Sequence, residues 1–83
     1  MNRTETLHLA TQAVADREKR YGMPADHFAK VAMLWGEAFG WSVQPQHVPL
    51  ALALLKIARE VNAHGDDNMI DLAGYAALAG EVA

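Results

Sequence analysis

Paired cations and acids in the last third of the chain are the residues best suited to chemistry. Lys56 and Arg59 precede a short connection at Gly65, and Asp67 and Asp71 follow it. The surrounding sequence is strongly apolar, and a charged side chain in such surroundings needs a partner. Lysine and arginine bind phosphate oxygens, whereas carboxylates orient such cations or bind Mg²⁺. A site for a phosphorylated ligand is therefore one interpretation of these residues.

Helices must position these residues, because apolar side chains recur with the spacing of amphipathic helices and no strand-like alternation occurs. Residues 1–83 are expected to form a single helical domain, an all-α, compact four-helix bundle. Thr4 is a candidate N-cap, Gly22 and Gly40 are suited to helix ends, and Pro24 and Pro45 to helix starts. The predicted helices span about residues 4–19, 24–39, 45–62 and 67–81.

The third helix is apolar all round from Val48 to Ala58, apart from Lys56, which predicts a central position. The last helix is rich in alanine and glycine and should let another helix approach closely, in this subunit or in a second one. A chain of 83 residues buries a thin core. We therefore expect self-association, as a homodimer or a higher homo-oligomer.

A short connection makes the last two helices an antiparallel hairpin. Counting outward from the connection places Arg59 level with Asp71, and Lys56 near Tyr75. These four residues and Asp67 are thus expected to form one cluster. Two interpretations remain open. The cluster is either an ion-pair network that fixes the register of the hairpin, or a ligand site in which Asp67 and Asp71 hold Mg²⁺ or orient the two cations.

Other polar residues add to this picture. Arg17 and Tyr21, at the end of the first helix, either orient the following turn or reach the same ligand. The histidines lack the spacing of metal ligands and are expected at the surface or at helix ends; they are His8, His27, His47 and His64.

Composition excludes several classes of protein. The chain has no cysteine, which rules out disulfides and cysteine-based zinc sites. Its net charge of −3 disfavours nucleic acid as a partner. The longest apolar run, from Val48 to Leu55, is too short to span a membrane. We expect no membrane association and a cytoplasmic location.

Four segments together resemble a family of small phage and prophage proteins. That family is similar to the nucleotide-modification-associated helical domain and, more remotely, to the MazG-like all-α nucleoside triphosphate pyrophosphohydrolases. The segments are Asp16-Arg17-x-x-x-Tyr21-Gly22-x-Pro24, Phe28-x-x-Val31-Ala32-x-Leu34-Trp35, Leu54-Leu55-Lys56-x-x-Arg59 and Asp67-Asn68-x-Ile70-Asp71-x-Ala73-Gly74-Tyr75-Ala76.

The resemblance implies an oligomeric four-helix bundle that hydrolyses a nucleoside triphosphate to the monophosphate and pyrophosphate with Mg²⁺. In those enzymes magnesium-binding glutamates are expected on the helix that carries Lys56 and Arg59 in this chain. Cations at these positions suit direct binding of phosphate, so whether the chain is an enzyme stays open.

Two functions follow as expectations. The first is a phage-type MazG-like domain that binds a nucleotide or another phosphorylated ligand in the host cytoplasm. The second is a non-enzymatic helical interaction module or inhibitor that acts on a host or phage protein. An open pocket beside the polar cluster would favour the first, and a closed cluster would favour the second.

Overall fold

The fold consists of four α-helices and no strand, which confirms the all-α prediction. The computed structural model describes all 83 residues. The helices are α1 (Arg3–Tyr21), α2 (Pro24–Phe39), α3 (His47–Asn62) and α4 (Asp66–Val82). The bounds of α2 are those predicted, and α1 and α4 extend slightly further at both ends. α3 begins at His47, because Pro45 lies in a turn before the helix instead of opening it.

Local interactions explain where the helices begin and end. The N-cap of α1 is Asn2 and not Thr4, because the backbone N–H of Glu5 donates a hydrogen bond of 2.8 Å to the Asn2 side chain. Gly22 and Gly40 follow α1 and α2 with φ angles of 85° and 71°. Residues with a side chain rarely adopt such angles, so the two glycines end these helices as predicted.

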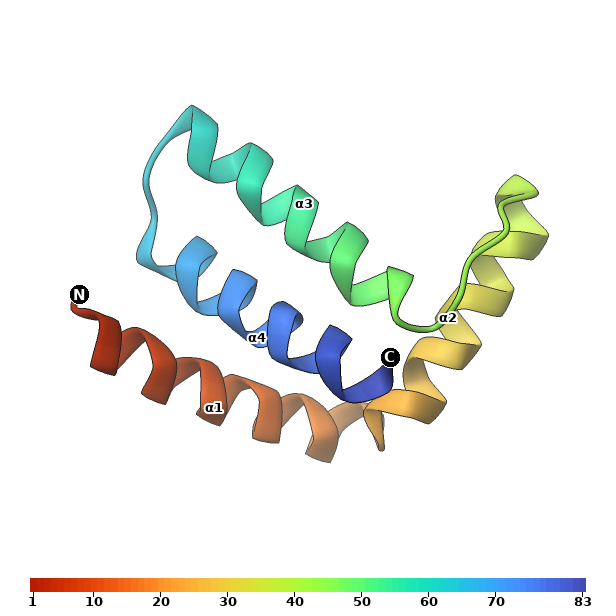
Figure 1. The fold of residues 1–83 in the computed structure, drawn as a ribbon, viewed down its shortest axis with the longest axis horizontal. Coiled ribbons are helices and arrows are strands. Elements are labelled where there is room, and N and C mark those ends of the chain that lie inside the picture. Colours follow the sequence, from red (N-terminus) through yellow and green to blue (C-terminus); the bar gives the residue numbers. More distant parts are fainter.

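α4 lies in the middle of the fold, between α1 and α3 (Figure 1). α1 and α4 run in the same direction and α3 runs opposite to both, which confirms the predicted hairpin of the last two helices. α1 and α3 do not pack against each other. α2 crosses one end of these three helices instead of lying alongside them. The molecule is therefore flat, with dimensions of 39 × 29 × 20 Å.

The prediction that α3 is the central helix is wrong, and the small residues of α4 explain why. A Cβ atom at Gly74 would lie 3.5 Å from Val14 Cγ2 and 4.0 Å from the Ala10 carbonyl oxygen of α1. Only a slim helix can be approached so closely from one side while α3 packs on the other. The close helix approach predicted for the last helix thus occurs within the subunit.

The core is thin, as predicted. Ten of the 83 residues are buried. Seven of them are hydrophobic, and the other three are Pro24, Pro49 and Gly74. The central cluster brings together α2, α3 and α4 through Phe28, Ala32, Val48 and Leu78. Phe28 and Val48 are almost completely buried. The core therefore sits where α2 crosses the other helices, away from the connection between α3 and α4.

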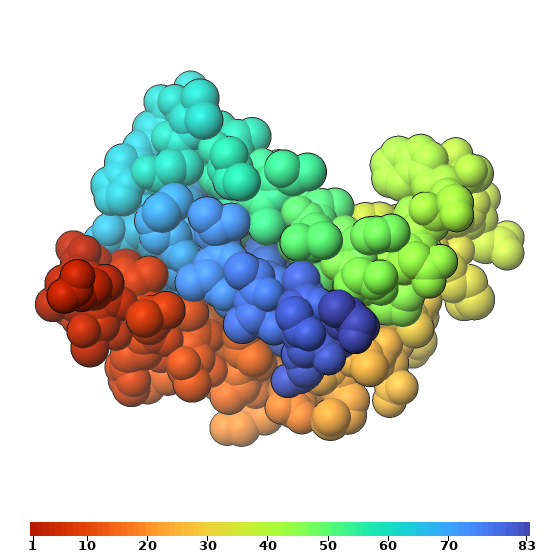
Figure 2. All heavy atoms as spheres, viewed as in Figure 1, coloured from red at the N-terminus to blue at the C-terminus, as the bar shows by residue number.

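Large apolar side chains of α3 remain exposed. They are Leu50, Leu54, Leu55, Ile57 and Val61. Figure 2 shows α3 along one edge of the molecule, separated by a notch from the tip of α2. None of the four helices combines the length and apolarity that crossing a bilayer requires.

Candidate functional site

The predicted polar cluster of α3 and α4 contains one direct ion pair. Lys56 Nζ lies 3.0 Å from Asp71 Oδ2. The Lys56 side chain is 15% exposed and that of Asp71 37%. The pair joins α3 to α4 at mid-helix, so the predicted contact between cations and acids across the hairpin is present for these two residues.

Arg59 does not belong to the cluster, contrary to the prediction. It is exposed and forms no ion pair, because Asp71 pairs with Lys56, one helical turn earlier. The connection explains the difference. Ala63 and Gly65 both have extended backbone, and Glu60 lies level with Asn68. The antiparallel pairing of α3 and α4 is therefore centred at residue 64 instead of residue 65. Arg59 consequently points to solvent.

Glu60 occupies the place next to the connection, and the sequence analysis missed it. Its carboxylate accepts hydrogen bonds from the Gly65 backbone N–H at 3.0 Å and from Asn68 Nδ2 at 3.2 Å. It also contacts His64, whose other ring nitrogen lies 3.3 Å from Asp66. The Gly65 N–H, followed by His64, lowers the pKa of Glu60, and the hydrogen bond with Glu60 raises the pKa of His64. The i, i+4 spacing of Glu60 and His64 is the signal that could have revealed this contact.

The predicted magnesium ligands, Asp67 and Asp71, do not belong to a larger group of metal-binding side chains. Asp67 is exposed, and the carboxylate of Asp71 is paired with Lys56. No group of three or more histidine, aspartate or glutamate side chains is placed to hold a metal ion. Mg²⁺ at Asp67 or Asp71 would therefore take its other oxygen ligands from waters and from the phosphates of a ligand.

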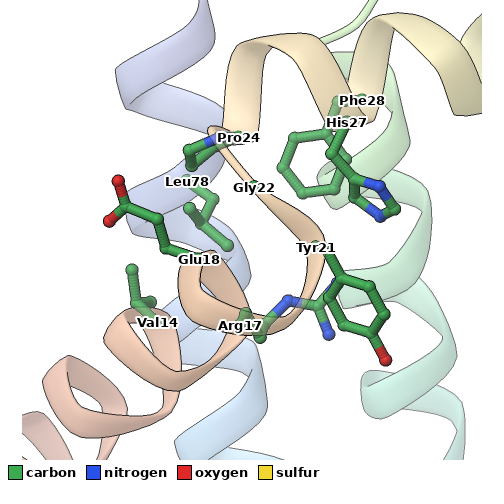
Figure 3. Close-up of a pocket in the computed structure, with 9 residues that line it drawn as sticks. All are labelled: Val14, Arg17, Glu18, Tyr21, Gly22, Pro24, His27, Phe28 and Leu78. Atoms are coloured by element: carbon green, nitrogen blue, oxygen red, sulfur yellow. The ribbon is translucent and has the colours of Figure 1, made fainter.

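The remaining predicted residues meet at the other side of α4. The guanidinium carbon of Arg17 lies 5.3 Å from the centre of the Tyr21 ring and 5.2 Å from that of Tyr75. The Tyr21 ring also stacks on His27, with 5.0 Å between the ring centres. Figure 3 shows the end of Arg17 beside the Tyr21 ring, with His27 next to that ring. Two tyrosines, one on α1 and one on α4, thus hold Arg17 through cation–π contacts, and His27 of α2 supports the Tyr21 ring.

Arg17 has no carboxylate partner, although it is only partly exposed. Figure 3 shows the Glu18 carboxylate turned away from Arg17. Asp71 lines a cavity that Arg17 also lines, but its ion pair is with Lys56. Burial, then the charges of Arg17 and Lys30, lower the pKa of His27, as expected beside an uncompensated cation.

We define the Arg17 patch as Arg17, Arg20, Tyr21, His27 and Tyr75. Arg20 joins it because its guanidinium carbon lies 6.0 Å from the centre of the Tyr21 ring. Sequence reasoning identified Arg17 and the two tyrosines but missed Arg20 and His27. The i, i+3 spacing of the two arginines was the available signal for Arg20. His27 reaches the patch only through the turn at Gly22, which spacing alone does not reveal.

The space around the patch decides what can bind. The cavity between α1 and α4 has a volume of about 30 Å³ and is lined by Arg17, Asp71 and Tyr75 among others. That volume holds about two water molecules and not a phosphate group. A second, open groove runs along the outside of α1, where Asp16 is the one acid among Arg17, Lys19, Arg20 and Tyr21. A ligand larger than water that contacts Arg17 therefore has room on this outer side.

The chain belongs to the family described as Domain of unknown function (DUF6378), whose model matches residues 5–83. No curated protein and no solved structure matches the chain.

Proposed function

From the surroundings of Arg17 in this DUF6378 domain, we propose that the protein binds a small phosphorylated ligand, such as a nucleotide, at the Arg17 patch. One observation carries the proposal: a partly buried guanidinium is fixed between two tyrosine rings and has no carboxylate partner. A fixed, uncompensated guanidinium favours an oxyanion, because arginine donates paired hydrogen bonds with the geometry of phosphate.

The groove along α1 supports the same ligand class. Lys19 and Arg20 line it together with Arg17, so a phosphate on this side meets three cations and a single acid, Asp16. The resemblance to nucleotide-processing helical domains agrees with this chemistry. Binding, and not hydrolysis, is proposed, because the chain offers no group of three acids to hold the metal ions that such hydrolysis uses.

Titration of the protein with pyrophosphate and with nucleoside mono-, di- and triphosphates, each with and without Mg²⁺, tests the proposal. In two-dimensional NMR spectra, the amide shifts should cluster at residues 13–21 and 71–75. Arg17→Gln should weaken binding by about tenfold or more, because a charge-assisted hydrogen bond contributes roughly 1.5–3 kcal/mol.

Arg59→Gln is the matched control, since it removes the same charge from an exposed arginine that lies outside the patch. It should leave the affinity unchanged. Absence of binding to every one of these ligands at millimolar concentration, or equal weakening by both substitutions, would contradict the proposal.

A helical interaction module is the second candidate, and the closed Lys56–Asp71 pair favours it. In that case the polar residues of α3 and α4 only fix the hairpin, and phosphorylated ligands do not bind. Thermal unfolding distinguishes the two candidates. A ligand that binds the folded state raises the unfolding temperature in a concentration-dependent way, whereas an interaction module shows no such shift.

A further inference from the structure

α3 carries a second apolar stripe, on the side that α4 does not cover. It consists of Leu50, Leu54, Ile57 and Val61, whose exposed fractions are 48%, 66%, 43% and 83%. The intervals of four, three and four residues are those of the seam between two helices in a coiled coil. We call these four residues the outer stripe. It contains no polar side chain, so water contacts apolar surface along its whole length.

The outer stripe is complementary to itself. In an antiparallel pair of α3 helices related by a two-fold axis, Leu50 would face Val61 of the second copy, and Leu54 would face Ile57 of the second copy. Both pairs are symmetric about the same point, midway between residues 55 and 56. A two-fold interface requires this symmetry, because the same patch is used on both subunits. Ala51 and Ala58 are also exposed, and their small side chains would let the helices approach closely.

The accessible surface matches what a dimer needs. The chain exposes 5629 Å². Compact monomers with the chain's mass of 9.0 kDa expose about 4,850 Å². The excess of roughly 800 Å² equals the area that one partner buries in a standard-sized interface. A standard-sized interface with a second copy would thus bring the exposed surface of each subunit to the usual value.

We propose that the protein forms a two-fold homodimer through the outer stripe, with the α3 helices antiparallel. The second copy is the occupant because the stripe matches itself in both spacing and symmetry. This interface lies on exposed residues of α3, a helix that makes no contact with α1, whereas the Arg17 patch lies between α1, the start of α2 and α4. The dimer is therefore independent of ligand binding.

Sedimentation equilibrium from low to high micromolar concentration tests the dimer. The wild-type chain should be dimeric, and Leu54→Glu and Ile57→Lys should each raise the dissociation constant by about tenfold or more, since each places charges at the centre of the apolar seam. Leu7→Glu is the matched control, because Leu7 is as exposed as Leu54 but lies on α1. It should leave the dimer intact.

The antiparallel register makes a sharper prediction. In a mixture of Leu54→Glu with Ile57→Lys, the two introduced charges face each other across the axis, so the mixture should dimerise more tightly than either variant alone. The chain has no cysteine. Leu54→Cys mixed with Ile57→Cys should therefore form a disulfide-linked heterodimer under mild oxidation, and Leu7→Cys should not.

Three results would overturn the proposal. They are a monomeric wild-type chain at high micromolar concentration, a dimer that Leu7→Glu weakens and Leu54→Glu does not, and a mixture of the charged variants that associates no better than its components. Circular dichroism establishes that each variant is folded. The cross-linking experiment does not depend on the charged variants.

Discussion

Lys56 Nζ lies 3.0 Å from Asp71 Oδ2, and this contact joins α3 to α4 at a level one turn away from Arg59. It directly joins two helices, whereas the other ion pairs of the fold involve His64 in the connection. Asp71 also lines the cavity beside Arg17. Its ion pair with Lys56 leaves Arg17 without a carboxylate partner.

Replacing Lys56 by methionine should lower the free energy of unfolding by about 1–2 kcal/mol, because the partly exposed Asp71 loses its partner. Urea unfolding measures this difference. Arg59→Met is the control and should change stability by less than about 0.5 kcal/mol, as for a surface residue without partners. Equal losses in the two variants would show that Arg59 does contribute to the hairpin.

A small and a large substitution at Gly74 should have opposite effects on stability. Gly74→Ala should be neutral or stabilising by up to about 1 kcal/mol, since alanine favours the helix and its Cβ would meet Val14 at an ordinary contact distance of 3.5 Å. Gly74→Leu should destabilise by about 1–3 kcal/mol, because the larger side chain forces α1 away from α4. Thermal unfolding compares the two. Similar unfolding temperatures would contradict the close packing of α1 and α4.

The Glu60–His64 pair should make stability depend on pH in the neutral range. The pKa of His64 is raised above its ordinary value of 6.5, first by the hydrogen bond and then by the charge of Glu60, with smaller effects from Asp66. This contribution is complete below about pH 6.5 and is lost as pH rises through the raised pKa. The lowered pKa of Glu60 has the opposite sign, so its contribution is lost as pH falls below 4.5.

Unfolding curves of the wild type and of His64→Asn between pH 6 and pH 9 test this effect. The wild-type advantage should be present at the acid end of this range and shrink toward the alkaline end. The comparison with His64→Asn is essential because the lowered pKa of His27 acts in the opposite direction, removing stability as pH falls below 6.5. A constant difference across the range would exclude the pair as its source.

Anion binding at the Arg17 patch should strengthen as pH falls. Burial, Arg17 and Lys30 lower the pKa of His27, and a bound anion would offset the charges of these two cations and favour the protonated ring. Sulfate is a suitable probe because its own charge stays constant between pH 6 and pH 8. Its affinity should be higher at pH 6, and His27→Gln should remove this dependence. The same pH dependence in His27→Gln would assign it to another group.

The sequence allowed the helices to be predicted well, because their ends have local causes. Gly22 and Gly40 end α1 and α2 through backbone angles that glycine adopts most easily, and Pro24 fits the first turn of α2. Only Asn2 and Pro45 differ from expectation, since Asn2 competes with Thr4 for the cap and Pro45 takes part in a turn.

The arrangement of the helices and the composition of the site could be predicted only in part. An apolar helix such as α3 is compatible with a central position or with a second interface, and sequence periodicity does not distinguish them. The partner of Asp71 depended on the extended backbone at Ala63 and Gly65, which shifted the register away from Arg59. The contacts of Arg17 with Tyr75 depended on α1 packing against α4, a pairing between segments far apart in the sequence.

The central place of α4 has a consequence for biosynthesis. α1 and α3 touch α4 but not each other, and α4 follows both of them in the chain. The ribosome therefore releases α4 after the three other helices. Until then, the nascent chain exposes the apolar faces that α4 later covers. Completion of this fold is expected to wait for the synthesis of α4, and a chain that still lacks α4 should be a good substrate for chaperones that bind apolar segments.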